Sequence, residues 1–185
     1  PDAFENRLEM DKPRNNGAPP VLRDYSGLSS DKIIYKADDS FISCLDSLRE
    51  QFPNFSDVVD DVKLFAIKSK ETNTAFHMPP VLLIGPPGIG KSEFMNKLSF
   101  YSTLPCKTLN MSGARDTIKL TGLSPSWGNA CPSEITKFMA HEQYANPFVT
   151  LDELDKSSGR NTGHDDKVQD CLLTLLEPST SKKFE

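Results

Sequence analysis

The chain has 185 residues, 37% hydrophobic and 25% charged, a composition that supports one packed domain and excludes wholesale disorder. Twenty-one basic and 26 acidic residues give a formal net charge of −5, so we expect no nucleic-acid partner. The purely apolar runs are too short to cross a bilayer, and we expect no membrane partner. Four scattered cysteines without a CxxC pair, and a start that does not resemble a secretory signal, predict a reduced, cytoplasmic setting.

The first part of the chain predicts an arm followed by helices. Residues 1–35 are rich in Asp, Asn, Pro, Gly and Ser and are interpreted as a flexible arm or linker. Residues 36–79 are predicted to hold two helices that lead into the rest of the chain. The first begins with Ser40 as its cap and stops at Pro53, and the second follows Ser56.

From residue 80 to residue 185 the apolar pattern alternates between the strand period and the helix period. Strands are expected over residues 81–84, 106–111 and 148–151. Helices are expected over residues 92–102, from residue 133 and over residues 168–176. Strands that alternate with helices predict an α/β fold, in which a parallel sheet carries helices on both faces.

One glycine-rich stretch matches G-x-x-x-x-G-K-[ST], the pattern of a phosphate-binding loop. It consists of Gly85, Pro86, Pro87, Gly88, Ile89, Gly90, Lys91 and Ser92. Glycines let successive N–H groups turn inward toward phosphate oxygens, and the helix that follows adds its amides and dipole. Lys91 is expected to reach the β- and γ-phosphates and Ser92 to bind Mg²⁺. An apolar run before the motif and a helical pattern after it favour a site for ATP and Mg²⁺ over a plain glycine-rich turn.

A second motif, residues 148–153, is an apolar run that ends in two carboxylates. Because the carboxyl ends of parallel strands face the ligand crevice, Asp152 is expected near the Mg²⁺ bound by Ser92. Glu153 is expected to be catalytic, polarising a water for in-line attack on the γ-phosphate. The alternative is a solvated acidic cluster, because further charged residues follow at once. The phosphate loop upstream favours the catalytic interpretation.

The two motifs together resemble an AAA+ ATPase, and further stretches resemble the ATPase module of Lon-type proteases. Those stretches are residues 112–116, 127–135, 151–156 (LDELDK, similar to DEIDK) and 172–178 (LLTLLEP, similar to LLEVLDP). The similarity covers roughly residues 55–185. It implies a P-loop NTPase fold with three αβα layers, present as a partial AAA+ core over residues 80–185. It also implies an ATP-hydrolysing ring motor, a homo-oligomeric hexamer, that unfolds or remodels protein substrates.

The resemblance also implies roles for two further residues. Trp127 occupies the position of a pore-loop aromatic that grips an extended substrate, although Gly128 and Asn129 depart from the usual aromatic-aliphatic-glycine triplet. The alternative is a core tryptophan. Asn110 occupies the position of a polar residue that restrains the catalytic Glu153, and the alternative is a strand-end asparagine that satisfies the turn.

The resemblance further leads us to expect a sensor strand, an arginine finger and a helical lid beyond Glu185. Without them, residues 1–185 are expected to bind nucleotide weakly and to hydrolyse it very slowly. Two other functions stay open: a remodeller without a protease, and a nucleotide-regulated binding module. A small-molecule kinase is disfavoured, because the pair Asp152-Glu153 suits water activation and no acceptor-binding feature is evident.

Overall fold

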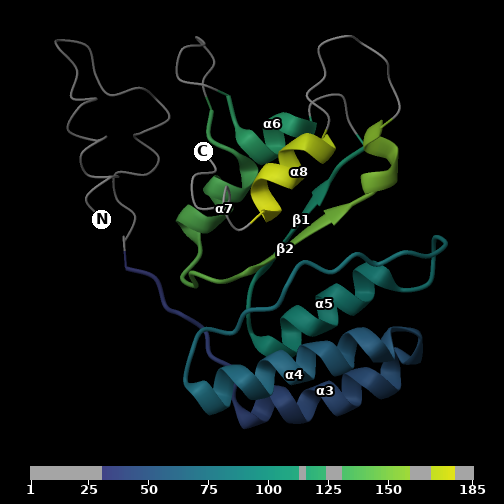
Figure 1. The fold of residues 1–185 in the computed structure, drawn as a ribbon, viewed down its shortest axis with the longest axis vertical. Coiled ribbons are helices and arrows are strands. Elements are labelled where there is room, and N and C mark those ends of the chain that lie inside the picture. Colours follow the sequence, from purple (N-terminus) through teal and green to yellow (C-terminus); the bar gives the residue numbers. More distant parts are fainter. Residues whose placement is uncertain (1–30, 113–115, 124–130, 159–167, 178–185) are drawn as a thin grey trace. The chain divides into compact units, whose positions relative to one another are not determined.

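The computed structural model describes residues 31–112, 116–123, 131–158 and 168–177 (Figure 1). The chain divides into two compact units. One, called here the phosphate-loop unit, comprises Ile33–Asn110 and Glu142–Asp152, and the second unit comprises Pro1–Lys32, Met111–His141 and Glu153–Glu185. The structure is rich in helices and contains a parallel sheet, which agrees with the predicted α/β fold of the P-loop type.

Two helices joined by a tight turn begin the phosphate-loop unit. Helix α3 (Asp39–Gln51) and helix α4 (Ser56–Thr72) flank the 3₁₀ turn η1 (Pro53–Phe55). The predicted cap of the first helix is wrong. Asp38 caps α3, because its carboxylate accepts a hydrogen bond of 2.8 Å from the N–H of Phe41. Ser40 is already the second residue of the helix, so its side chain does not occupy the N-cap position.

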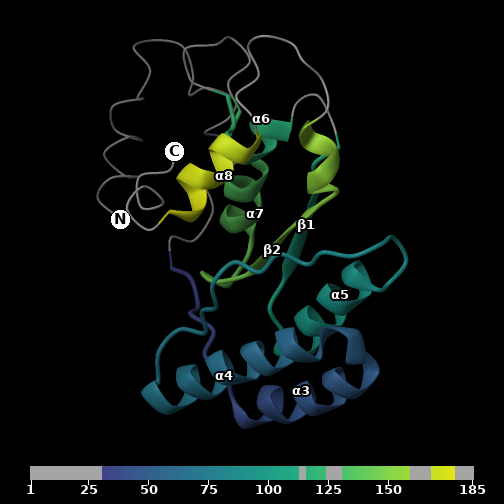
Figure 2. The same ribbon diagram turned by 45° about the vertical axis from the view of Figure 1, so that its right-hand side comes forward.

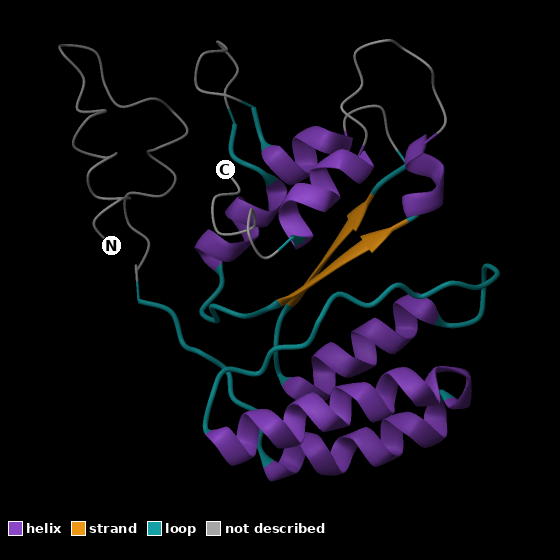
Figure 3. Cartoon of the chain, viewed as in Figure 1, coloured by secondary structure: helices purple, strands orange, loops and turns teal. Residues whose placement is uncertain are grey.

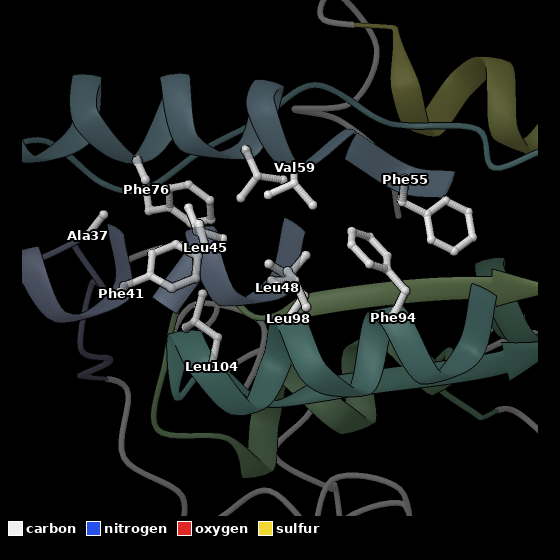
Figure 4. Packing of buried hydrophobic residues seen from close by; sticks show 12 residues of the cluster. Ala37, Phe41, Leu45, Leu48, Phe55, Val59, Phe76, Phe94, Leu98 and Leu104 are labelled. Atoms are coloured by element: carbon white, nitrogen blue, oxygen red, sulfur yellow. The ribbon is translucent and has the colours of Figure 1, made fainter. Parts of the chain in front are cut away.

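Helix α5 (Lys91–Ser102) follows the glycine-rich loop and packs against α3. The two views in Figures 1 and 2 show α3, α4 and α5 side by side. Their apolar faces meet in one buried cluster, drawn in Figure 4. It contains Ala37, Phe41, Leu45, Leu48, Phe55, Val59, Val62, Ala66, Phe76, Phe94, Leu98 and Leu104. The helices of residues 36–79 therefore share a hydrophobic core with the helix that follows the phosphate loop.

The sheet in the described part of the chain consists of two parallel strands, shown in orange in Figure 3. Strand β1 (Cys106–Asn110) pairs with β2 (Phe148–Asp152), with Cys106 opposite Phe148 and Asn110 opposite Asp152. The two predicted strands are confirmed, and both run in the same direction. Their carboxyl ends therefore lie level with each other at one edge of the sheet.

The predicted buried strand over residues 81–84 is wrong. This segment has no strand structure, and Leu82 and Ile84 are 69% and 84% exposed. Only Leu83 packs against the hydrophobic cluster. A strand exists through hydrogen bonds to a neighbouring strand, and the ladder of the described residues pairs β1 with β2 alone. The apolar run by itself does not supply a partner.

The described residues of the second unit form three helices and a 3₁₀ segment. They are α6 (Asp116–Thr121), α7 (Glu134–His141) and α8 (Val168–Leu176), and the 3₁₀ segment η2 (Leu154–Ser158) follows β2 along the chain. Helix α6 packs against α7 and α8. Ser133 precedes α7, and its Oγ accepts a hydrogen bond of 3.0 Å from the N–H of Thr136. The predicted helices from residue 133 and over residues 168–176 are confirmed.

Within the described ranges, no helix combines the length and the apolar character needed to cross a lipid bilayer. The four cysteines are free thiols. In the same part of the chain, no group of three or more His, Cys, Asp and Glu side chains is arranged to hold a metal ion.

Candidate nucleotide-binding site

The backbone of the glycine-rich loop adopts a conformation that only glycine takes without strain. Gly88 and Gly90 have φ angles of +82° and +92°, in the left-handed region. A Cβ atom on Gly88 would meet no heavy atom within 4 Å, so the space beside this residue is open. The dihedral angle, and not crowding, therefore selects glycine at position 88.

Lys91 folds back over this loop. It is the first residue of α5, and its Nζ donates hydrogen bonds of 2.8 Å to the carbonyl of Gly85 and 3.0 Å to that of Pro86. The ammonium group is thereby held at the loop. Charge-assisted hydrogen bonds to phosphate oxygens are stronger than bonds to neutral carbonyls, so an anion would compete well for this amine. The structure thus brings the Lys91 ammonium to the backbone of Gly85 and Pro86 within the motif.

A contact that sequence reasoning missed supports the loop from the side of the α3–α4 turn. The Nδ2 atom of Asn54 in η1 donates a hydrogen bond of 3.0 Å to the carbonyl of Ile89. The ring of Phe52 lies 3.6 Å from the position that a Cβ on Gly90 would occupy. Asn54 and Ile89 are 35 positions apart, and no local pattern links them. The turn-forming Pro53 between two helices was the only sequence signal in this region.

The residues present fit ATP and Mg²⁺. The N-terminus of the 12-residue helix α5, the ammonium of Lys91 and the open space at Gly88 suit an anionic phosphate group. The Ser92 hydroxyl is exposed in the first turn of α5, and the Asp152 carboxylate lies half-buried at the end of β2. A hydroxyl and a carboxylate are hard oxygen donors, the kind that Mg²⁺ prefers. Both residues belong to the phosphate-loop unit.

The acidic motif lies where parallel strands end. Asp152 is the last residue of β2, and Asn110, the last residue of β1, is its partner in the register. Glu153 follows with a φ of +58°, a conformation that is uncommon for a residue with a side chain and is often found at functional sites. Its carboxylate forms an ion pair with Lys156, whose N–H donates a hydrogen bond of 3.0 Å to the Glu153 carbonyl. The predicted pair of Asn110 with Glu153 stays a prediction.

Trp127, the predicted pore-loop aromatic, lies outside the described residues. Arg115, in the stretch of residues 112–116 that resembles Lon-type modules, also lies outside them. Asp116, the last residue of that stretch, begins α6.

The fold and the glycine-rich loop are those of the P-loop type, and comparison with known proteins identifies the family. Residues 81–184 match the ATPase family associated with various cellular activities (AAA). The match covers more than half of the chain, which therefore belongs to this family. The predicted resemblance to AAA+ ATPases is confirmed.

Individual relatives are Lon proteases. The chain is 29% identical to the Lon protease of Mycoplasma genitalium over 106 residues, 57% of this chain and 13% of that protein. It is 27% identical to the Lon protease of Clostridium acetobutylicum over 137 residues, 74% of this chain and 17% of that protein. The chain thus spans less than a fifth of the length of these relatives. The AAA module of this chain is therefore similar to Lon proteases at low identity.

Proposed function

We propose that the chain is the ATP-binding and ATP-hydrolysing core of an AAA+ ring motor that unfolds or remodels proteins. The observation that carries the proposal is the loop of Gly88 and Gly90 in left-handed conformation, with the Lys91 ammonium held over it. A loop of this geometry that leads directly into a helix N-terminus suits an anion of several phosphates. In the proposed organisation, residues 1–35 are an arm, residues 36–79 lead into the core, and residues 80–185 bind the nucleotide.

Each motif residue has a role in this proposal. The backbone of residues 85–90 holds the phosphates, and Lys91 neutralises charge on the β- and γ-phosphates. Ser92 and Asp152 would hold Mg²⁺, which supplies further charge neutralisation on the phosphate oxygens when bound. Glu153 orients the attacking water and accepts its proton, and Asn110 restrains Glu153 until then. In the structure the Glu153 carboxylate forms an ion pair with Lys156.

The proposed partners follow from the family rather than from the site. AAA family membership and the similarity to Lon proteases support a homo-oligomeric ring that acts on protein substrates, with Trp127 in the pore. A neighbouring subunit would supply an arginine finger, worth about 10³–10⁵-fold in rate in comparable NTPases. We therefore expect residues 1–185, as a monomer, to hydrolyse ATP very slowly.

Titration with MgATP, together with a sensitive hydrolysis assay, tests the proposal. Wild type is expected to bind MgATP, and Lys91→Ala to lose binding by at least about 10-fold, because a charge-assisted contact is removed. Lys97→Ala removes the same charge from the same helix, away from the loop, and is expected to bind normally. Glu153→Gln is expected to bind MgATP but to lose the residual hydrolysis.

Two results would contradict the proposal. Equal MgATP affinity of wild type and Lys91→Ala would show that the loop is not the phosphate site. Hydrolysis that survives Glu153→Gln unchanged would remove the catalytic role of this residue. In that case a nucleotide-regulated binding module, which the ion pair of Glu153 with Lys156 would also suit, becomes the better interpretation.

A further inference from the structure

We propose that the turn between α3 and α4 positions the phosphate loop, and that Asn54 is its positioning residue. The inference deepens the proposed function and rests on it for its role in ATP binding. Its starting point is the hydrogen bond of 3.0 Å from Asn54 Nδ2 to the carbonyl of Ile89. This is a contact between the helical hairpin and the backbone of the phosphate loop itself.

The carbonyl that Asn54 holds controls the direction of a neighbouring N–H. Ile89 lies between the two glycines with left-handed φ, Gly88 and Gly90. The peptide unit that joins Ile89 to Gly90 is planar and trans, so its C=O and N–H point in opposite directions. By fixing the carbonyl toward the hairpin, Asn54 directs the Gly90 N–H away from it. Without this hydrogen bond, the direction of the Gly90 N–H would depend on backbone torsions next to Gly88 and Gly90, which rotate easily because glycine has no Cβ.

Aromatic side chains hold the turn itself in place. The rings of Phe55 and Phe94 lie 4.9 Å apart between centroids, and those of Phe52 and Phe94 lie 5.6 Å apart in an edge-to-face arrangement. Figure 4 shows Phe55 and Phe94 at one end of the hydrophobic cluster. Phe52 also lies against Gly90. The residues on both sides of Asn54 are therefore anchored to α5 and to the loop, so the Asn54 amide is presented from a rigid base.

A second amide provides the control that separates positioning from general stability. Gln51, at the end of α3, donates a hydrogen bond of 2.9 Å from Nε2 to the hydroxyl of Tyr101. Both Gln51 and Asn54 are exposed, and both contact the segment formed by the loop and α5. Tyr101 lies near the opposite end of α5 from Lys91. Loss of either bond should cost similar stability, but only the bond of Asn54 bears on the phosphate loop.

The test compares Asn54→Ala, Asn54→Asp and Gln51→Ala in the 185-residue chain. MgATP and inorganic tripolyphosphate, which contacts only a phosphate site, are titrated into each protein. Loss of one oriented hydrogen bond is expected to weaken both ligands about 3- to 10-fold in Asn54→Ala. Asn54→Asp keeps the side-chain size but replaces the donor with a carboxylate, so its loss should be at least as large. Gln51→Ala is expected to change either affinity less than about twofold.

Hydrogen exchange of the ligand-free proteins supplies a readout that does not require nucleotide. Amides of residues 85–92 are expected to exchange faster in Asn54→Ala than in wild type or Gln51→Ala, while α3 and α4 exchange as in wild type. Equal loop exchange and equal affinity in the Asn54 and Gln51 variants would overturn the inference. So would unfolding of both Asn54 variants, which would make Asn54 a purely structural residue. Failure of wild type to bind MgATP would instead overturn the proposed function, whatever the loop exchange shows.

Discussion

At the scale of single residues, the dihedral angle of Gly88 makes a prediction that separates binding from stability. An alanine there must adopt φ near +82°, which costs about 1–2 kcal/mol for a residue with a Cβ. Because the neighbouring space is open and the loop is exposed, the loop should change conformation rather than unfold the protein. We expect Gly88→Ala to weaken MgATP binding and to leave the free energy of unfolding nearly unchanged, as measured by calorimetric titration and urea denaturation.

Gly122 is the matched control for this prediction. It also has a left-handed φ, of +73°, but a Cβ there would lie 2.6 Å from the Cys131 carbonyl oxygen. Gly122→Ala should therefore lower stability in the second unit without changing the affinity of the phosphate loop. Normal MgATP binding by Gly88→Ala would show that the left-handed conformation is not required for the site.

The motif residues show how far single residues could be predicted. Gly85, Lys91 and Ser92 follow from the sequence because a phosphate loop is a local structure whose spacing is fixed by its own backbone. The position of Asp152 at the carboxyl end of a strand also follows from the sequence, whereas its register partner, Asn110, is known only from the structure. Asn54 could not be found in this way. Its partner lies 35 positions away, and only the packing of the hairpin on α5 brings them together.

At the scale of elements, the cap of α3 gives a quantitative prediction. The Asp38 carboxylate satisfies the N–H of Phe41, one of the donors that a helix start leaves unpaired. Asp38→Ala is expected to lower the free energy of unfolding by about 1 kcal/mol. Ser40→Ala, at the position that the sequence indicated, is expected to change it by less than about 0.5 kcal/mol. Chemical denaturation measures the free energy of unfolding of both variants. A larger loss in Ser40→Ala than in Asp38→Ala would show that Ser40 is the cap.

The packing of α3 also predicts a dependence on alkaline pH. Burial first, and then the negative charge of Asp38, raise the pKa of the Tyr35 phenol well above its ordinary value. Folding therefore disfavours the phenolate, and the unfolded chain loses this proton first. The stabilising contribution is fully present below pH about 10 and is lost as the pH rises above it.

Tyr35→Phe removes this titration and keeps the ring contacts with Phe41 and Phe76. Between pH 9 and pH 11.5, we expect the free energy of unfolding measured in urea to fall more in wild type than in Tyr35→Phe. The slope cannot exceed about 1.4 kcal/mol per pH unit, because the phenol exchanges a single proton. A difference that does not change with pH would contradict the proposed role of burial.

Two apolar runs of similar length illustrate what the sequence could not decide about elements. Residues 148–151 form most of a strand, whereas residues 81–84 do not, although both runs are bounded by turn-forming residues. A strand requires a neighbour, and the sequence of a run does not name its neighbour. The helices were predicted better, because their hydrogen bonds are internal and their apolar period shows in the sequence.

At the scale of the whole molecule, the described residues of the two units differ in how much apolar surface they bury. Helices α3, α4 and α5 contribute most of the buried cluster, and Leu45, Leu48 and Val62 in it are fully shielded from solvent. Among the described residues of the second unit, the buried apolar side chains are Met111, Leu120 and Val168, and α7 has no fully buried residue. Since local opening is governed by buried apolar contacts, the units should open at different free energies.

Hydrogen exchange of the 185-residue chain should therefore be slowest in α3, α4 and α5 and distinctly faster in α6, α7 and α8. Leu45→Ala, which leaves a cavity in the cluster and costs about 2–5 kcal/mol, should accelerate exchange in α3–α5 and leave α6–α8 unchanged. Peptide-resolved mass spectrometry measures both effects. Uniform protection, or acceleration of both units by Leu45→Ala, would show that they unfold as one. Independent opening would instead mean that nucleotide bound to the loop stabilises the helices α3–α5 first, because binding protects the unit that holds the ligand.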